Sequence, residues 1–344
     1  MSFEQPVLWL GMAGFTPEQR EHLNALLGRL PKGWPAWQIG AFSEADAWLV
    51  SGEKSRLLSA DTLRILAGLP SERAVQLNLE EVDRPIAFSL PLGPSNLDPV
   101  YTFDPTSGAS LQKVLQQFES WLRPLRSQFV LGGQLIEREN QLLPGVYHVS
   151  YKGVLLAVMD FHEWRIGIAP KADPVDFELA RWDRRPRSAH DIPRHFLQSS
   201  VTQLRWIFAQ RTGRDVLPPR YRDRPVYFRH APSVPLRWLR DSQLVLLREL
   251  SVAPGLFDDL LRRTGLNRAQ LARDLASLYF AGSVTTTAEK AGVAGFGSSE
   301  DVVSVSPSSG GLESPSTAAE LALARRPHSS MMGDLTAPVQ LGLK

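Results

Sequence analysis

The sequence predicts an α/β protein of several parts, in which a domain with a parallel sheet comes first. Short apolar stretches alternate with amphipathic helical stretches over residues 1–126, the order that gives parallel strands covered by helices. β-branched and aromatic runs separated by turn residues follow, as in a mixed α+β domain. Three closely spaced helical stretches then precede a Ser-, Gly- and Pro-rich end without apolar periodicity.

These changes of pattern predict where the parts begin and end, and a length of 344 residues suits two or three domains. We expect an α/β domain at 1–126, a mixed α+β domain at 127–240, a helical module at 241–287 and a disordered tail at 288–344. The absence of cysteine excludes disulfides, thiolate zinc sites and a cysteine nucleophile. No apolar run has the length of a signal peptide or membrane span, so we expect a cytoplasmic protein without a membrane partner.

Within the first part, five apolar stretches are predicted as strands: 7–12, 37–42, 45–50, 74–79 and 85–92. A helix is predicted after Thr16, because Thr-Pro-Glu-Gln supplies an N-cap, a first-turn proline and a capping-box glutamine. Two more helices are expected at 59–68 and 108–122, the latter with a helical apolar stripe: Leu111, Val114, Leu115, Phe118, Trp121 and Leu122.

The middle part is predicted to form hairpins from the runs 146–150, 154–161 and 164–169. A further strand is expected at 177–182, a helix at 194–211 and an extended segment at 224–230. From residue 241, three short helices are predicted: around 244–250, at 256–263, and after the N-cap Asn267 as far as Gly282. Residues 283–287 complete the pattern as a short β-prone run.

The order of strands and helices in the first part resembles that of a response-regulator receiver, a CheY-like domain. The resemblance implies a bacterial signalling protein, with acids at the end of the first and third strands that hold Mg²⁺ and accept a phosphoryl group. Here the first strand ends in Gly11-Met12-Ala13-Gly14 and the third in Ser51-Gly52, with Asp46 at the wrong end of that strand. The first part is therefore interpreted as a degenerate pseudo-receiver without cofactor, and an unrelated small α/β domain is the alternative.

The helical module at 241–287 resembles a winged helix. If Leu271, Leu275 and Leu278 face inward, the helical period turns Gln270, Arg273 and Ser277 outward, where they could reach DNA. Three further arginines lie nearby and are candidate nucleic-acid-binding residues: Arg262, Arg263 and Arg268. Asp258, Asp259 and Asp274 dilute their charge, so a protein-facing role for the module stays open.

Arginine is concentrated in residues 181–240, which contain 14 Arg, no Lys and 4 Asp. Arginine suits bidentate contact with phosphate or carboxylate and stacking on aromatic rings, and tyrosine and tryptophan are interleaved here. We expect a candidate anion site at the start of the segment: Arg181, Arg184, Arg185 and Arg187. The alternative is that the arginines pair with residues 1–180, where 21 Asp and Glu exceed 15 Lys and Arg.

No motif for catalysis is present, and the spacing around His190 and His195 does not predict a metal site. The sequence thus predicts a non-catalytic bacterial signalling or regulatory adaptor that acts by protein binding. The alternative is a transcriptional regulator that uses the winged helix and the arginine-rich segment on DNA. An enzyme of unrecognised type is a third hypothesis, which would need convergent buried acid and histidine groups.

Overall fold

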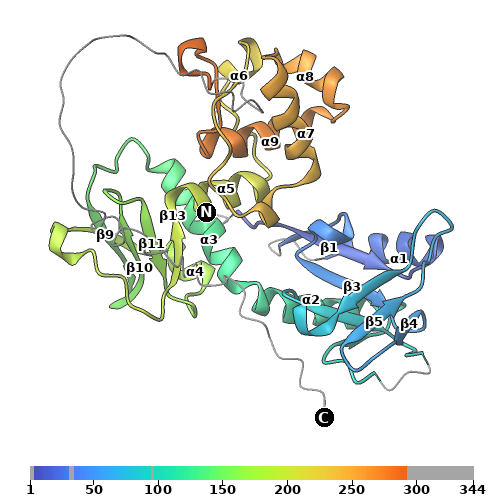
Figure 1. Cartoon of the computed structure of the whole chain (residues 1–344). Coiled ribbons are helices and arrows are strands. Elements are labelled where there is room, and N and C mark those ends of the chain that lie inside the picture. Colours follow the sequence, from blue (N-terminus) through green and yellow to red (C-terminus); the bar gives the residue numbers. More distant parts are fainter. Residues whose placement is uncertain (1–3, 31–34, 94–96, 293–344) are drawn as a thin grey trace, which may run out of the picture.

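Figure 1 shows the computed structural model, which describes residues 4–30, 35–93 and 97–292. We name three lobes: an N-terminal lobe (4–121), a middle lobe (123–211) and a C-terminal lobe (215–292). The N-terminal lobe contains a parallel sheet of order β2 (Ala36–Ile39), β1 (Val7–Ala13), β3 (Ala47–Ser51), β7 (Ile86–Ser89) and β8 (Thr102–Phe103). The predicted parallel α/β sheet is thus confirmed, and its order is one found in doubly wound sheets.

Helices α1 (Pro17–Leu27) and α2 (Gly108–Trp121) cover one face of this sheet and share a core with Leu8, Leu10 and Leu49. The predicted capping box at Thr16 is present, since its side chain accepts from the Gln19 backbone N–H. Leu111, Val114, Leu115 and Phe118 of α2 are buried, as the apolar stripe predicted. Sequence periodicity therefore located both helices of this face.

The other face is covered by a small antiparallel sheet, not by a helix. It consists of β4 (Ser55–Leu57), β5 (Thr62–Ile65) and β6 (Val75–Asn78). The prediction of a helix at 59–68 is therefore wrong. Leu63 and Ile65 point into the core while Arg64 between them is exposed, an alternation that suits a strand with partners on both sides. The stretch 74–79 is a strand as predicted, but of this small sheet.

A single helical turn makes the crossover from β2 to β3. Residues Phe42–Glu44 form this turn, and a Cβ atom on Gly11 of β1 would lie 3.0 Å from the Phe42 Cα and 2.9 Å from the Trp48 ring. Gly11 thus lets the crossover pack directly on the sheet. The crossover brings Glu44 and Asp46 to the edge of the lobe.

Helix α3 (Arg123–Glu137) follows α2 almost without interruption and was not predicted. Figure 1 shows the two helices joining the N-terminal lobe to the middle lobe. The expected boundary between residues 126 and 127 falls inside α3. Leu125 packs against the cores of both lobes.

The middle lobe is a five-stranded antiparallel sheet of order β12 (Arg181–Arg185), β9 (Val146–Tyr151), β10 (Val154–Asp160), β11 (Arg165–Ile168) and β13 (Leu197–Ser200). The predicted hairpins are confirmed. The strand predicted at 177–182 is shifted, because α4 (Pro174–Glu178) precedes β12, and the helix predicted from 194 begins only at Val201 as α5 (Val201–Arg211). Helix α3 packs closely on α5 at Gly132, where a Cβ would lie 2.4 Å from the Leu204 carbonyl oxygen.

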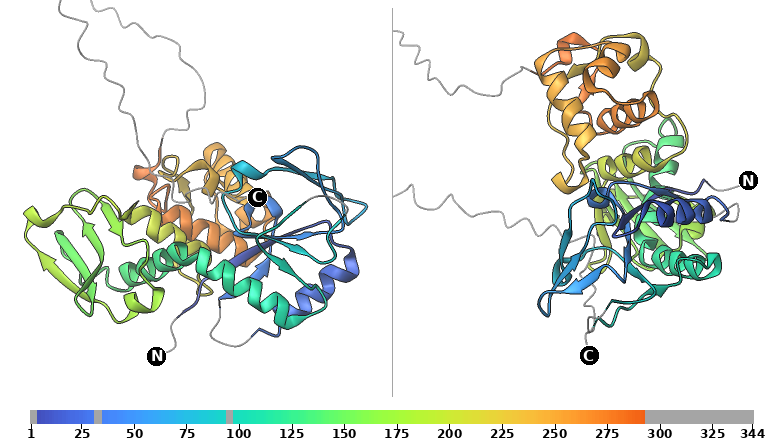
Figure 2. Two further views of the ribbon diagram at one scale, coloured as in Figure 1. Left: turned by 90° about the horizontal axis from the view of Figure 1, so that it is seen from below. Right: turned by 90° about the vertical axis from the view of Figure 1, so that its right-hand side faces the viewer.

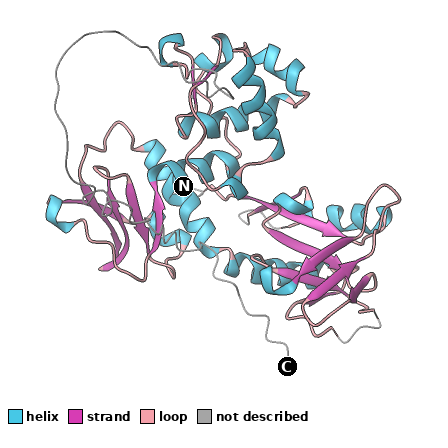
Figure 3. Ribbon diagram, in the orientation of Figure 1, coloured by secondary structure: helices cyan, strands magenta, loops and turns pink. Residues whose placement is uncertain are grey.

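The C-terminal lobe contains α6 (Arg220–Asp223), β14 (Tyr227–Phe228), α7 (Asp241–Val252), α8 (Phe257–Thr264), α9 (Arg268–Phe280) and β15 (Val284–Thr285). The three predicted helices and the β-prone run are confirmed, and Asn267 caps α9 by accepting from the Gln270 N–H at 2.8 Å. Strand β15 pairs with β14 (Figure 3). The core of this lobe also includes Trp206 and Ala209 of α5.

Figure 2 shows α9 lying over α5, with the two large sheets at opposite ends of the connected helices α2 and α3. Helix α5 thus belongs to two cores, one with α3 and one with α9. None of the helices in the described ranges is long and apolar enough to cross a membrane. The tail predicted to be disordered, residues 288–344, lies outside the described residues from 293 onward.

Candidate functional site

The carboxyl edge of the parallel sheet is the usual ligand site of such folds. Here the strand ends carry Ser51, Gly52 and Ser89, and the Gly52 N–H donates to the Ser89 hydroxyl at 3.2 Å. A Cβ on Gly52 would lie 2.1 Å from the Ser89 carbonyl oxygen, so the strand ends touch backbone to backbone. Across residues 4–30, 35–93 and 97–292, no three His, Asp, Glu or Cys side chains are grouped to hold a metal ion.

A cluster of polar and charged side chains lies instead where the three lobes meet. Asp46, in the crossover before β3, forms a two-pronged ion pair with Arg211 at the end of α5, with both N···O distances 2.6 Å. The Asp46 carboxylate also accepts from the Trp9 backbone N–H at 2.8 Å. The side chains of Asp46 and Arg211 are only 9% and 13% exposed, so this pair is shielded from water.

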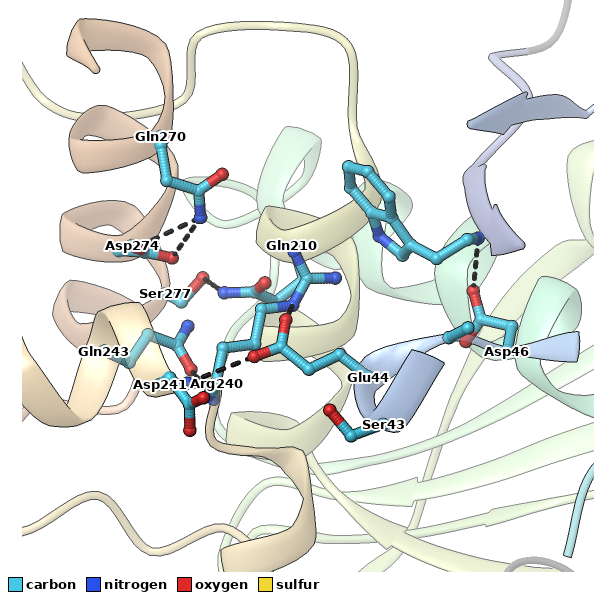
Figure 4. Close-up of polar contacts among 12 residues, drawn as sticks. Ser43, Glu44, Asp46, Gln210, Arg240, Asp241, Gln243, Gln270, Asp274 and Ser277 are labelled. Carbon is cyan, nitrogen blue, oxygen red and sulfur yellow. Dashed lines mark hydrogen bonds and ion pairs between the residues drawn. The ribbon is translucent and has the colours of Figure 1, made fainter. Parts of the chain in front are cut away.

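A second contact joins the same crossover to the start of α7. Arg240 lies 3.8 Å from the Glu44 carboxylate, and the Asp241 N–H donates to Glu44 at 3.2 Å (Figure 4). The Arg240 guanidinium also lies 4.8 Å from the centre of the Trp9 ring, at cation–π distance. Burial, and then the neighbouring Arg211, lower the pKa of Arg240 from its ordinary value. We call Trp9, Glu44, Asp46, Arg211 and Arg240 the interlobe clamp.

Helix α9, which was predicted to present Gln270, Arg273 and Ser277 outward, is partly covered by α5 and Trp9. Ser277 is completely buried and accepts a 2.6 Å hydrogen bond from Gln210 of α5, so its predicted outward position is wrong. Arg273 is half-buried and lies 5.6 Å from the centre of the Trp9 ring. Gln270 is half-buried and donates to both carboxylate oxygens of Asp274 at 3.0 and 3.1 Å (Figure 4).

The reason for this difference is that α9 packs on two sides. Leu271, Leu275 and Leu278 face α7 and α8 as expected, while the small side chains Ala272 and Ala276 are buried as well. These alanines, spaced by four, lie on one side of α9 and line a cavity together with Ala209 of α5. The four-residue spacing of Ala272 and Ala276 was the feature of the sequence that indicated a second buried face of α9.

The other candidate nucleic-acid-binding residues are exposed and engaged locally. Arg262 pairs with Asp259, Arg268 lies 3.2 Å from Asp258, and Arg263 donates to the Ala253 carbonyl at 3.3 Å. These three arginines do not form one exposed face together with Gln270 and Ser277, because Ser277 is buried. Their role in DNA binding stays a prediction.

The candidate anion-binding arginines lie on and after the edge strand β12. Alternation along the strand places Arg181 and Arg185 on one side and Arg184 on the other. Arg181 pairs with Asp183 at 2.7 Å, and Arg184 donates to the Pro144 carbonyl at 2.9 Å. Arg187 is exposed in the turn that follows. These four side chains therefore do not converge on one point, and anion binding stays a prediction.

Three arginines of the arginine-rich segment pair with acids of the N-terminal lobe. Besides Arg211 with Asp46 and Arg240 with Glu44, Arg214 lies 2.7 Å from Glu4. For these three, pairing with the acidic first part is confirmed. The sequence showed the charge imbalance but gave no signal for which residues would meet.

Comparisons of the chain with protein-family models, with curated proteins and with solved structures found no match. The function is therefore argued from the site itself. The site consists of contacts between lobes. Arg211 pairs with Asp46, Arg240 lies near Glu44, and the ring of Trp9 lies within cation–π distance of Arg240 and Arg273.

Proposed function

We propose that this chain is a non-catalytic signalling or regulatory adaptor that acts by binding proteins. In this proposal the N-terminal lobe is a pseudo-receiver whose contact surface is its β2–β3 crossover, and the C-terminal lobe is a winged-helix-like module held by that crossover. The observation that carries the proposal is the coverage of α9. Its polar face is occupied by Gln210 of α5 and by the ring of Trp9.

The charge of the C-terminal lobe supports protein binding over DNA binding. Residues 241–292 contain six Lys or Arg and six Asp or Glu, and the run 283–287, which includes β15, contains no cation. DNA binding depends chiefly on positive charge that neutralises phosphates. A module without net charge, whose third helix has Ser277 buried and Gln270 and Arg273 half-buried, offers a duplex little attraction and a reduced reading surface, which supports protein binding as the proposed function.

The surface proposed for the partner is the outer side of α7 and the residue that follows it toward α8. Four apolar side chains are exposed there: Leu244, Val245, Val252 and Leu256, at 47%, 41%, 78% and 44%. Exposed apolar groups gathered on one element are typical of interaction sites. The clamp leaves this side of the lobe accessible.

Photo-crosslinking from position 252 tests this proposal. A photoreactive amino acid at Val252 should crosslink a distinct cellular protein, and the additional substitution Val245→Asp should abolish that product. The matched control is a photoreactive residue at Val154, a 61% exposed position on β10 in the middle lobe. The same crosslinked protein from both positions, or its persistence with Val245→Asp, would count against the α7 surface.

The second candidate function is DNA binding, and three exposed arginines favour it: Arg262, Arg263 and Arg268. It is tested by titrating the full chain against random-sequence duplex DNA over a salt series. We expect no steep fall of affinity with salt. A strongly salt-dependent affinity that is lost with Arg262→Ala and Arg268→Ala would favour a DNA-binding regulator.

A further inference from the structure

A cavity lies between the middle and C-terminal lobes, where α9 lies over α5 (Figure 2). Its volume is about 350 Å³. Residues of α9 form one side of the wall, and the segment 212–216 that follows α5, together with Arg222 of α6, forms the other. The volume lies at the lower end of the range for sites that hold a small organic molecule.

The apolar part of the wall is aliphatic. It consists of small or branched side chains from α5, α9 and the segment after α5: Ala209, Val216, Ala269, Ala272 and Ala276. Within the described parts of the chain, no aromatic side chain lines this cavity. A nucleobase would therefore find no ring to stack on, whereas a saturated carbon chain would lie against the alanine methyl groups.

The charged part of the wall is mostly positive. Four arginines line the cavity, and the acid among the lining residues is Asp215: the arginines are Arg214, Arg222, Arg268 and Arg273. Arg214 is already held by two acids, since it lies 2.7 Å from Glu4 and 3.1 Å from Glu137. The other three arginines outnumber the lining carboxylate, so the cavity attracts anions.

Arg273 has the strongest requirement for an anionic partner. Its side chain is half-buried, and among the described residues no carboxylate oxygen lies within 4.0 Å of its guanidinium nitrogens. The centre of the Trp9 ring lies 5.6 Å away and offers no acceptor oxygen. A guanidinium carries five N–H donors in a planar fork that matches a carboxylate or phosphate group. Arg273 can therefore bind an anion through two parallel hydrogen bonds.

Arg222 and Arg268 supply positive charge at a second point of the wall. Their guanidinium carbons lie 4.9 and 5.3 Å from the centre of the same ring, that of Phe257. Their carboxylate partners, Asp215 and Asp258, are 56% and 75% exposed, and pairs in such contact with water contribute little to stability. Each guanidinium also has further N–H donors, so a ligand can bind without breaking these pairs.

We propose that this cavity binds a small saturated organic anion that carries at least two anionic groups, carboxylate or phosphate. Arg273 holds one group and Arg222 with Arg268 holds another, while the carbon chain between them lies against Ala269 and Ala272. Arg268 and Arg273 are five residues apart in α9, about 7.5 Å along the helix axis, a span that such a molecule covers. This inference goes beyond the proposed function and does not depend on it.

Isothermal titration of the full chain at low ionic strength tests the site. Citrate is the carboxylate probe, and fructose 1,6-bisphosphate is the phosphate probe. We expect at least one of them to bind, and the tighter of the two identifies the anionic group that the arginines prefer. Acetate and inorganic phosphate, which carry a single anionic group, should bind more weakly by about tenfold or more.

Two variants test whether the anion lies in this cavity. Arg273→Gln should weaken binding by about tenfold, because a charged hydrogen-bond donor is lost. Ala269→Glu should abolish binding, because it adds a carboxylate to the wall, while an acid in the first turn of α9 suits the helix. The matched control is Arg29→Gln, which removes the same charge from an exposed position of the N-terminal lobe and should leave the affinity unchanged.

Three results would overturn the proposal. The first is no heat of binding for citrate or the bisphosphate at roughly 1 mM ligand at two temperatures. The second is unchanged affinity in Arg273→Gln and Ala269→Glu, or an equal loss in Arg29→Gln, which would place the anion elsewhere. The third is equally tight binding of acetate or inorganic phosphate, which would contradict a site for two anionic groups. Circular dichroism of each variant identifies a folding defect, and Arg222→Gln replaces a variant that fails to fold.

Discussion

Asp46 joins parts of the architecture that are far apart in the sequence. Its carboxylate binds the Arg211 guanidinium twice and accepts the Trp9 backbone N–H, so one side chain joins β1, the crossover and α5. Sequence reasoning noticed Asp46 only as an acid at the wrong end of a strand. Its partner lies 165 residues away along the chain, and no local pattern encodes such a pairing.

Removing Asp46 should destabilise the protein strongly. In Asp46→Ala, Arg211 loses its carboxylate partner and keeps only a 3.3 Å hydrogen bond to the Val7 carbonyl at a site that is 13% exposed, and we expect a loss of about 3–5 kcal/mol in the free energy of unfolding. The matched control is Glu163→Ala, which breaks a pair with Arg165 that is more than half exposed and should cost no more than about 1 kcal/mol. Urea denaturation measures both. Equal losses in the two variants would contradict the importance of the clamp.

Asp274 should make stability depend on pH. Burial raises its pKa above the ordinary value of 3.8, although bonds from Gln270 and nearby Arg240 oppose the shift. The folded state therefore holds this proton more tightly than the unfolded state. Its contribution to stability is present below pH 3.8 and is lost as the pH rises through the raised pKa.

Asp274→Asn, which keeps the shape of the neutral acid, should remove this contribution. Compared with the wild type, the variant should become relatively more stable as the pH increases from 4 toward neutrality. Urea denaturation at several pH values measures the difference. Wild-type and variant stability curves that run parallel over this range would show that Asp274 is not the titrating group.

At the scale of the elements, the sequence predicted the helices and strands whose positions follow from local apolar periodicity and capping residues. Helices α1, α2 and α9 and the hairpins of the middle sheet were found in this way. The stretch 59–68 was misassigned, because its apolar residues suit a helix as well as a strand and only the neighbours β4 and β6 decide between them. Helix α3 was missed, because no side chain caps its start and Gly132-Gly133, a pair typical of turns, lies within it.

The direct packing of the crossover on β1 gives a prediction at Gly11. In Gly11→Ala the added methyl group would lie 2.9 Å from the Trp48 ring and 3.0 Å from the Phe42 Cα, so the crossover must move. We expect a loss of about 1–3 kcal/mol in the free energy of unfolding. Gly213→Ala is the control, since a Cβ there meets no atom within 4 Å. Equal melting temperatures for the two variants would show that the crossover does not depend on this contact.

At the scale of the whole molecule, three lobes are joined through α5 and the crossover. Changes of sequence pattern predicted a first, a middle and a helical part, but residues 215–240, expected in the middle part, contribute Leu217, Tyr221 and Val226 to the core of the C-terminal lobe. The meeting of α9 with α5 and Trp9 had no signal in local patterns beyond the two alanines of α9. One residue of the predicted DNA-reading face, Ser277, is for this reason part of an internal contact, while Gln270 and Arg273 are half-buried. The central claim is that the interlobe clamp and α5 together hold α9.

Hydrogen exchange of the α9 amides, followed by mass spectrometry, tests this claim most directly. It compares the wild type with the variant Glu44→Ala/Arg240→Ala, which removes the contacts of the crossover and of Trp9 with the start of α7 while leaving Asp46 and Arg211 in place. We predict slow exchange over residues 271–278 in the wild type and clearly faster exchange in the variant, with the middle sheet unchanged. Identical exchange of α9 in the two proteins would contradict the claim that the N-terminal lobe holds this helix.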